Sequence, residues 1–101
     1  MVRSNAANKQ RNIRGSSKDR AARKNKLLRI YGDGILVPCI HCGALVDYET
    51  MEVDKIIPQS MGGRYVWNNI HASCFHCNRT RSDNATPEEI AKLQAMVIFT
   101  R

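Results

Sequence analysis

Two cysteine pairs with identical spacing constrain this chain more than any other feature. The pairs are Cys39 with Cys42 and Cys74 with Cys77, and 31 residues separate them. A gap of two residues lets both thiolates of a tight turn reach one ion, and two such turns complete a tetrahedral sulfur shell. Gly43, directly after the first pair, suits the left-handed backbone that such a turn often needs. The spacing therefore predicts one zinc ion held by all four cysteines, with four free buried thiols or two disulfides as the alternatives.

A zinc ion with four thiolate ligands has no open position for a substrate. We therefore expect this zinc to be structural and to leave any catalysis to other groups. A chain of 101 residues forms one domain at most, and at this size an apolar core alone is marginal. Residues 1–16 have few apolar side chains and no periodicity, so we expect a flexible basic tail followed by one zinc-stabilised domain over residues 17–101.

Positive charge is concentrated in the first third of the chain. Residues 1–30 contain ten Lys/Arg and one acid, a net charge of +9, whereas residues 31–101 contain six Lys/Arg and eight acids, a net charge of −2. This distribution favours a polyanionic partner, with a solvated tail as the alternative. Nucleic acid fits better than a membrane surface, because no amphipathic aromatic face accompanies the charge. Without a membrane span or a signal-peptide segment, the expected location is a reducing cytoplasm.

The pattern of apolar and turn residues predicts an α+β fold. A basic helix is expected to begin at Ser17 as its cap and to end at Tyr31, with Gly32 just past its end. The expected strands cover residues 35–37, 44–46 and 51–57, with a return strand around 64–70. A short helix should follow the second cysteine turn.

The clearest helix signal covers residues 86–99. Thr86 is the expected cap, Pro87 stands at the first helical position, and Glu89 completes a capping box. The buried stripe of this helix is expected to contain Ile90, Leu93 and Val97.

Two polar residues between and after the cysteines offer hard oxygen ligands. Asp54 lies on an expected strand and Asn78 at the start of an expected helix. Such ligands suit Mg²⁺ or Mn²⁺, and an ion there polarises a phosphodiester during cleavage. By spacing alone the pattern is weak, because one Asp and one Asn could equally form a turn and a helix cap.

The run from Cys39 to Asn78 resembles the HNH endonuclease family, in its zinc-bound branch with four cysteines. The matching segments are CIHCG, VDKIIP, the GG loop, NNI and CFHCN, in the family's order. The basic helix and the YGDG segment before the first pair look like small phage and prophage members. The resemblance implies a ββα-metal hairpin and helix as the core, with the basic helix before it and the last helix after it.

Carried over position by position, the resemblance implies that Asp54 and Asn78 hold a catalytic Mg²⁺ or Mn²⁺ and that Asn69 braces the loop. The slot of the general base, a histidine in the family, holds Lys55. An unperturbed lysine has a pKa of about 10.4, which makes it a poor base at neutral pH. We expect Lys55 to contact the scissile phosphate as a cation, while the divalent ion or His71 activates the attacking water. For His71 taken alone, a structural role is the favoured alternative. A Lys55 base with a lowered pKa is the alternative.

Phosphate contacts are expected from basic residues on two helices, with a solvated helix face as the alternative. These residues are Arg20, Arg23, Lys24, Arg79 and Arg81. The histidines of the cysteine turns, His41 and His76, are expected to face solvent. Three aromatic residues are expected to belong to the core rather than to stack on bases, namely Tyr65, Trp67 and Phe75.

The expected function is an endonuclease that hydrolyses DNA phosphodiester bonds, by nicking or by double-strand cutting. The expected partner is DNA in duplex form, bound by a monomer or weak dimer, and phage packaging proteins are further candidate partners. The alternative is a zinc-bound DNA-binding protein whose cutting site has decayed. Retention of Asp54, Asn69 and Asn78 favours the nuclease, whereas Lys55 favours the alternative.

Overall fold

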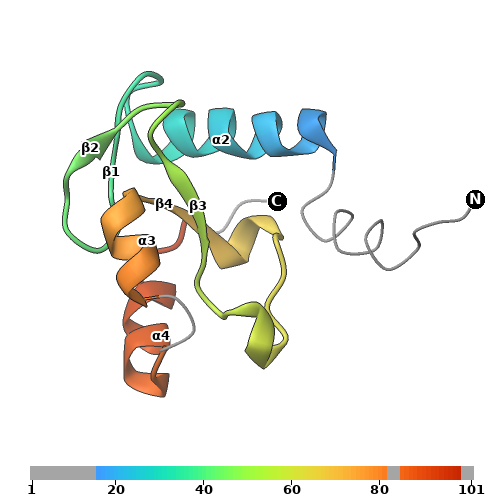
Figure 1. Cartoon of the computed structure of the whole chain (residues 1–101), viewed down its shortest axis with the longest axis vertical. Helices are drawn as coiled ribbons and strands as arrows, with labels where there is room; N and C mark the ends of the chain where they lie inside the picture. The colour runs from blue at the N-terminus through green and yellow to red at the C-terminus, as the bar shows by residue number, and fades with distance from the viewer. Residues whose placement is uncertain (1–15, 82–84, 99–101) are drawn as a thin grey trace, which may run out of the picture.

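The computed structural model describes residues 16–81 and 85–98. Its elements follow the expected α+β order, with one helix, two pairs of short strands and then two helices (Figure 1). Apart from Ser16, the expected flexible tail over residues 1–16 lies outside the described residues. No helix in the described part of the chain has the length and apolar character needed to cross a membrane.

The basic helix α2 covers Ser17–Tyr31. Its cap is Ser16 and not Ser17, because Ser16 and Asp19 form a reciprocal capping box: Asp19 N donates to Ser16 Oγ at 3.1 Å and Ser16 N donates to Asp19 Oδ2 at 3.2 Å. The helix ends at Tyr31, with Gly32 just past its end, as expected. A Cβ at Gly32 would lie 2.0 Å from the carbonyl oxygen of Leu36, so only glycine fits this close approach.

Two antiparallel strand pairs follow. Strands β1 (Val37–Pro38) and β2 (Leu45–Val46) enclose the first cysteine turn. Strands β3 (Glu52–Lys55) and β4 (Ile70–Ser73) form the central hairpin, in which Asp54 pairs with His71.

Strand β1 begins later and strand β3 ends earlier than expected, because side chains take over backbone hydrogen bonds there. Asp33 Oδ1 accepts from the N–H groups of Ile35 and Leu36, so β1 begins later. At the end of β3, Arg81 donates to the carbonyl oxygens of Lys55 and Ile56. The connection to β4 contains two 3-10 turns, Gln59–Met61 and Trp67–Asn69, and the return strand therefore begins only at Ile70.

Helix α3 (Phe75–Arg81) begins inside the second cysteine turn, and α4 (Pro87–Gln94) follows Thr86. Thr86 caps α4 by accepting from Glu89 N at 3.1 Å. The carboxylate of Glu89 does not complete a capping box, because it accepts from Arg81 Nε at 2.9 Å. Helix α4 also ends earlier than expected, with a turn after Gln94 and Phe99 outside the described residues.

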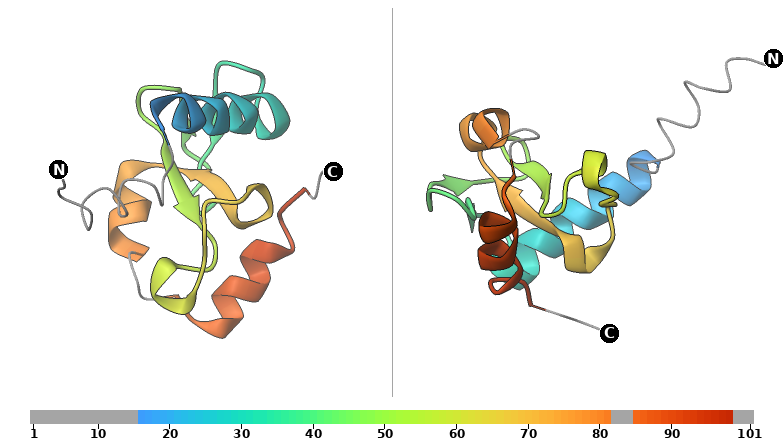
Figure 2. Two further views of the ribbon diagram at one scale, coloured as in Figure 1. Left: turned by 90° about the vertical axis from the view of Figure 1, so that its right-hand side faces the viewer. Right: turned by 90° about the horizontal axis from the view of Figure 1, so that it is seen from below.

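Two apolar clusters hold these elements together. Leu27 and Leu28 of α2 pack against the hairpin residues Met51, Ile70 and Ala72. The expected stripe of α4 forms the second cluster, in which Ile90, Leu93 and Val97 pack with Ile40 and Ile56. Figures 1 and 2 show α2 beside the start of β3, with α3 and α4 on the side of the hairpin away from it.

Candidate functional site

The four cysteine sulfurs converge at one point. All of the Sγ atoms lie within 4.8 Å of one another, and Cys42 Sγ lies 3.9 Å from Cys74 Sγ. Sulfurs bound at about 2.3 Å to a tetrahedral zinc ion lie about 3.8 Å apart, whereas a disulfide requires about 2.05 Å. The predicted set of four cysteines is confirmed, and its geometry fits zinc.

In each cysteine turn a backbone N–H group donates to the first thiol. His41 N donates to Cys39 Sγ and Cys77 N donates to Cys74 Sγ, each at 3.4 Å. Gly43 has a φ of 81°, the left-handed conformation that the sequence suggested.

The thiols also influence one another's ionisation. Burial opposes ionisation of Cys39, but backbone N–H groups of Cys42, Cys74 and His41 outweigh it and lower its pKa to about 6. The hydrogen bond with Cys74, followed by burial and the other thiols, raises the pKa of Cys77 to about 12. Four adjacent thiolates require a compensating cation, and a zinc ion held by them would supply it.

Asp54 is buried and is held by two side chains from other elements. Arg81 Nη1 lies 2.9 Å from Asp54 Oδ1, and His41 Nε2 lies 2.6 Å from Asp54 Oδ2. The same guanidinium binds Glu89 and two carbonyl oxygens at the end of β3. The exposed position expected for Arg81 is wrong: the residue is 8% exposed, because these acceptors compensate its charge inside the fold.

Asp54 and Asn78 line one cavity of about 330 Å³ together with Lys55 and Arg79. Lys55 reaches this cavity with its Nζ 4.1 Å from the centroid of the Tyr65 ring. The structure thus brings together both expected metal ligands, the residue in the base slot and one expected phosphate contact.

Glu52 is a further oxygen donor beside this cavity that the sequence analysis did not identify. Its Oε1 accepts from Asn78 Nδ2 at 3.4 Å. The alternation of side chains along a strand could have indicated Glu52 from the sequence. Residues two apart on a strand point to the same side, so a residue two positions before Asp54 is a candidate neighbour of the same site. Glu52 and Asp54 are two apart on β3, on either side of Val53.

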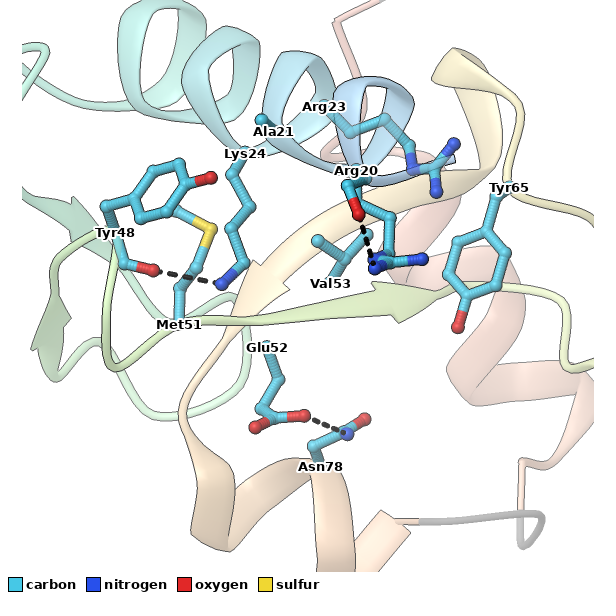
Figure 3. A pocket seen from close by; sticks show the side chains of 11 residues that line it. Arg20, Ala21, Arg23, Lys24, Tyr48, Met51, Glu52, Val53, Tyr65 and Asn78 are labelled. Atoms are coloured by element: carbon cyan, nitrogen blue, oxygen red, sulfur yellow. Dashed lines mark hydrogen bonds between the residues drawn. The ribbon is translucent and has the colours of Figure 1, made fainter. Parts of the chain in front are cut away.

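A larger cavity of about 540 Å³ adjoins the first and shares Val53, Tyr65 and Asn78 with it. Figure 3 shows Arg20 and Lys24 pointing from α2 toward β3, with Glu52 and Asn78 beyond the strand. Lys24 Nζ donates to the carbonyl oxygen of Tyr48 at 3.0 Å and lies 4.8 Å from the centroid of the Tyr48 ring, and both of these partners are neutral. We refer to the two adjoining cavities together as the basic groove.

Asn69 braces the loop between β3 and β4. The residue is buried, and its Oδ1 accepts from Ile57 N at 2.9 Å. Its Nδ2 donates to the carbonyl oxygens of Ile57 and Arg64 at 3.1 Å and 3.0 Å. A Cβ at Gly63 would lie 1.6 Å from the Ile57 carbonyl oxygen, which explains the glycine in this loop.

His71 lies in the core and does not line the cavity that contains Asp54. Its Nδ1 accepts from Ala72 N at 2.8 Å, and its ring centroid lies 3.9 Å from that of Tyr31. Burial lowers the pKa of His71 to about 4, so the side chain is neutral at pH 7. His71, the imidazole considered for activating the attacking water, is therefore a core residue outside the lining of the Asp54 cavity.

Two other expectations about single residues were wrong, while His76 is exposed as expected. His41 does not face solvent, because it binds Asp54. Phe75 is 56% exposed, and Arg79 lies over its ring at 4.6 Å from the centroid. Tyr65 and Trp67 pack against the core, as expected.

Comparison with known proteins identifies the family. The model of a family described as HNH endonuclease matches residues 39–93, more than half of the chain. The chain belongs to the HNH endonuclease family. The matched segment begins at Cys39, the first cysteine of the cluster, and extends into α4. The HNH domain of this protein therefore includes the hairpin, α3 and the ion pair between Arg81 and Glu89.

One relative is the CRISPR-associated endonuclease Cas9 of Actinomyces naeslundii. The HNH protein is 37% identical to it over 46 residues, which are 45% of this chain and 4% of the Cas9 chain. The likeness therefore concerns a small part of Cas9. No solved structure matches the chain.

Proposed function

We propose that this HNH protein is a metal-dependent endonuclease that hydrolyses DNA phosphodiester bonds. One observation carries the proposal: Asp54 and Asn78 line the same cavity as the cationic residues Lys55 and Arg79. Oxygen ligands beside positive side chains are the combination that phosphodiester cleavage requires.

The donor set fits a hard divalent cation. Asp54 and Asn78, with Glu52 beside them, offer carboxylate and amide oxygens, which suit Mg²⁺ or Mn²⁺. Each carboxylate oxygen has two lone pairs, so the hydrogen bonds from His41 and Arg81 still leave positions on Asp54 for an ion. Such an ion supplies positive charge at the phosphate and stabilises the leaving oxygen.

The protein's own side chains supply the remaining contacts. Lys55 and Arg79 bind the scissile phosphate and stabilise the negative charge that develops there. Asn69 acts indirectly, because it holds the loop directly after β3 and so fixes the position of Lys55. His71 is buried and has no part in the proton transfer.

The substrate is a polynucleotide rather than a small phosphodiester. The basic groove continues from the Asp54 cavity toward α2, where Arg20, Arg23 and Lys24 line it. Phosphate contacts of this kind position nucleic acid without reading its sequence. DNA is the proposed nucleic acid, in keeping with the endonuclease family.

The test is cleavage of supercoiled plasmid by the purified zinc-loaded protein with Mg²⁺, with Mn²⁺ or without a divalent ion. We expect nicked or linear products only with the ion. Asn78→Ala should reduce the rate by about 100-fold or more, the scale of losing a group that stabilises the transition state. Asp54→Asn should act similarly while keeping the size of the side chain beside Arg81. Asn68→Ala, the same change at an exposed position, is the matched control.

Two outcomes would contradict the proposal. Equal cleavage by wild type and Asn78→Ala would place the activity elsewhere or in a contaminant. Salt-sensitive DNA binding without cleavage under any metal condition would favour the alternative, a DNA-binding protein whose cutting site has decayed.

A further inference from the structure

Asp54 and the two side chains that hold it line separate cavities. One is lined by Asp54, Lys55 and Asn78 and belongs to the proposed substrate site. The other, of about 370 Å³, is lined by His41, His76 and Arg81, among others. The two cavities share no lining residue. His41 therefore contacts Asp54 without lining the cavity of the proposed substrate site.

His41 is carried by the first zinc turn, directly before Cys42. Its Nε2 lies 2.6 Å from Asp54 Oδ2, slightly closer than is usual for a charge-assisted hydrogen bond from nitrogen to a carboxylate. Arg81 holds the other oxygen, Oδ1, at 2.9 Å. With both oxygens held from different elements, the plane of the carboxylate is fixed.

We propose that His41 is a positioning residue: it orients the Asp54 carboxylate toward the divalent ion and thereby links the zinc turn to the catalytic cavity. The inference rests on the proposed function, because it concerns the ion that Asp54 would hold. His41 does not replace the histidine base that the family has in the position of Lys55. Its Nε2, the ring nitrogen nearest the cavity residues, is already hydrogen-bonded to Asp54. Partners that hold a ligating carboxylate typically affect metal affinity or activity by about 10- to 100-fold when they are lost.

The chain contains a matched control for this inference. His76 occupies the same place in the second cysteine turn, directly before Cys77. Its side chain is exposed. Either substitution removes a histidine beside a cysteine of the cluster, but within the described residues only His41 binds Asp54.

The experiment measures Mn²⁺ binding by electron paramagnetic resonance and Mn²⁺-dependent plasmid cleavage for zinc-loaded wild type and variants. We expect His41→Ala to weaken Mn²⁺ binding by about 10-fold or more. The Mn²⁺ concentration that gives half-maximal cleavage should rise by the same factor. His76→Ala should match wild type. His41→Gln retains a donor of similar reach and should recover most of the loss. Zinc content and thermal unfolding are measured on every variant, and His41→Gln serves where His41→Ala does not fold.

Three results would overturn the inference. One is a zinc-loaded His41→Ala protein whose Mn²⁺ affinity stays within twofold of wild type. The second is an equal loss in His41→Ala and His76→Ala. The third is a His41→Gln protein that folds, holds zinc and shows no more Mn²⁺ affinity than His41→Ala. If wild type binds Mn²⁺ through Asp54 and Asn78 in these cases, the proposed function stands and only the role of His41 fails. Absence of Mn²⁺ binding by wild type would overturn both.

Discussion

Arg81 Nη1 donates to Asp54 Oδ1 at 2.9 Å, and the two residues join α3 to the centre of β3. The same guanidinium binds Glu89 of α4 and the carbonyl oxygens of Lys55 and Ile56. A single buried cation therefore connects the hairpin with both C-terminal helices. It also sets where β3 ends.

This arrangement predicts a large loss of stability when Arg81 is removed. Arg81→Met should lower the free energy of unfolding by about 3–5 kcal/mol, because it leaves the Asp54 carboxylate buried without its cation. Arg79→Met, on the exposed side of the same helix, should change it by less than about 0.5 kcal/mol. Urea unfolding of the zinc-loaded proteins measures both values. A loss below about 1 kcal/mol for Arg81→Met would show that water or His41 compensates the carboxylate.

The role of Arg81 could not be deduced from the sequence. Arg79 and Arg81 follow Asn78 closely and look alike as basic residues of a short helix. Their different positions depend on acceptors far along the chain: Asp54 lies 27 residues before Arg81. Burial of an arginine depends on such distant acceptors, which local patterns do not reveal.

The zinc turns show the same limit. The spacing of the cysteines was sufficient to predict the sulfur cluster, because it is a local property of two turns. His41 and His76 occupy equivalent places in these turns, yet only His41 meets Asp54. Sequence spacing cannot distinguish them, since the difference arises from the way the first turn packs beside β3. The Asp54 and Asn78 site was anticipated through the family resemblance, whereas the contact of Glu52 with Asn78 depends on how α3 packs against β3.

A second prediction concerns zinc. We expect metal analysis to find one zinc ion per chain, and we expect Cys42→Ser or strong chelation to unfold the domain, because binding to a structural four-cysteine site contributes to folding directly. Circular dichroism before and after chelation measures the loss of structure. Ser60→Ala, a change of similar size at an exposed position outside the cluster, is the control. A Cys42→Ser protein that folds like wild type would contradict the prediction.

The basic groove predicts a specific salt dependence of DNA binding. Removing one phosphate contact should reduce the slope of log affinity against log salt by about 0.9. Lys24→Gln should show this reduction, because Lys24 lines the groove and its charge is not compensated by its carbonyl partner. Lys18→Gln, on the same helix but outside the lining of the groove, should leave the slope nearly unchanged. Fluorescence anisotropy at several salt concentrations tests both, and equal slopes for the two variants would exclude the groove as the DNA contact.

Burial of His71 predicts a loss of stability in mild acid. Its pKa is lowered to about 4, below the unfolded value of 6.5, so the unfolded chain binds the proton more readily. Above about pH 6.5 the histidine is neutral in both states, and its burial does not reduce the free energy of unfolding. As the pH falls toward 4, proton binding by the unfolded chain lowers the free energy of unfolding. We expect wild type to lose about 2 kcal/mol more than His71→Phe between pH 7.5 and pH 5. Urea unfolding in excess zinc measures the difference, and parallel pH curves would exclude this cause.

The final prediction concerns Lys55, which occupies the family's histidine slot and lines the cavity with Asp54 and Asn78. If Lys55 is a cationic contact, Lys55→His places a group of pKa about 6.5 where a base can act. A well-positioned general base contributes about 10²- to 10⁴-fold, and a site adapted to lysine will realise only part of that. We therefore expect single-turnover cleavage at pH 7–8 to accelerate by about 10-fold or more, with little change in DNA affinity.

Lys55→Ala separates the two roles of this residue. For a cationic contact, Lys55→Ala should cost less activity than Asp54→Asn, because Arg79 still faces the same cavity. For a lysine base, Lys55→Ala would abolish cleavage, and the wild-type rate would rise through a single ionisation well below pH 10. The wild-type pH–rate profile beside these variants distinguishes the roles. A Lys55→His enzyme no faster than wild type would defeat the cationic role that the cavity supports.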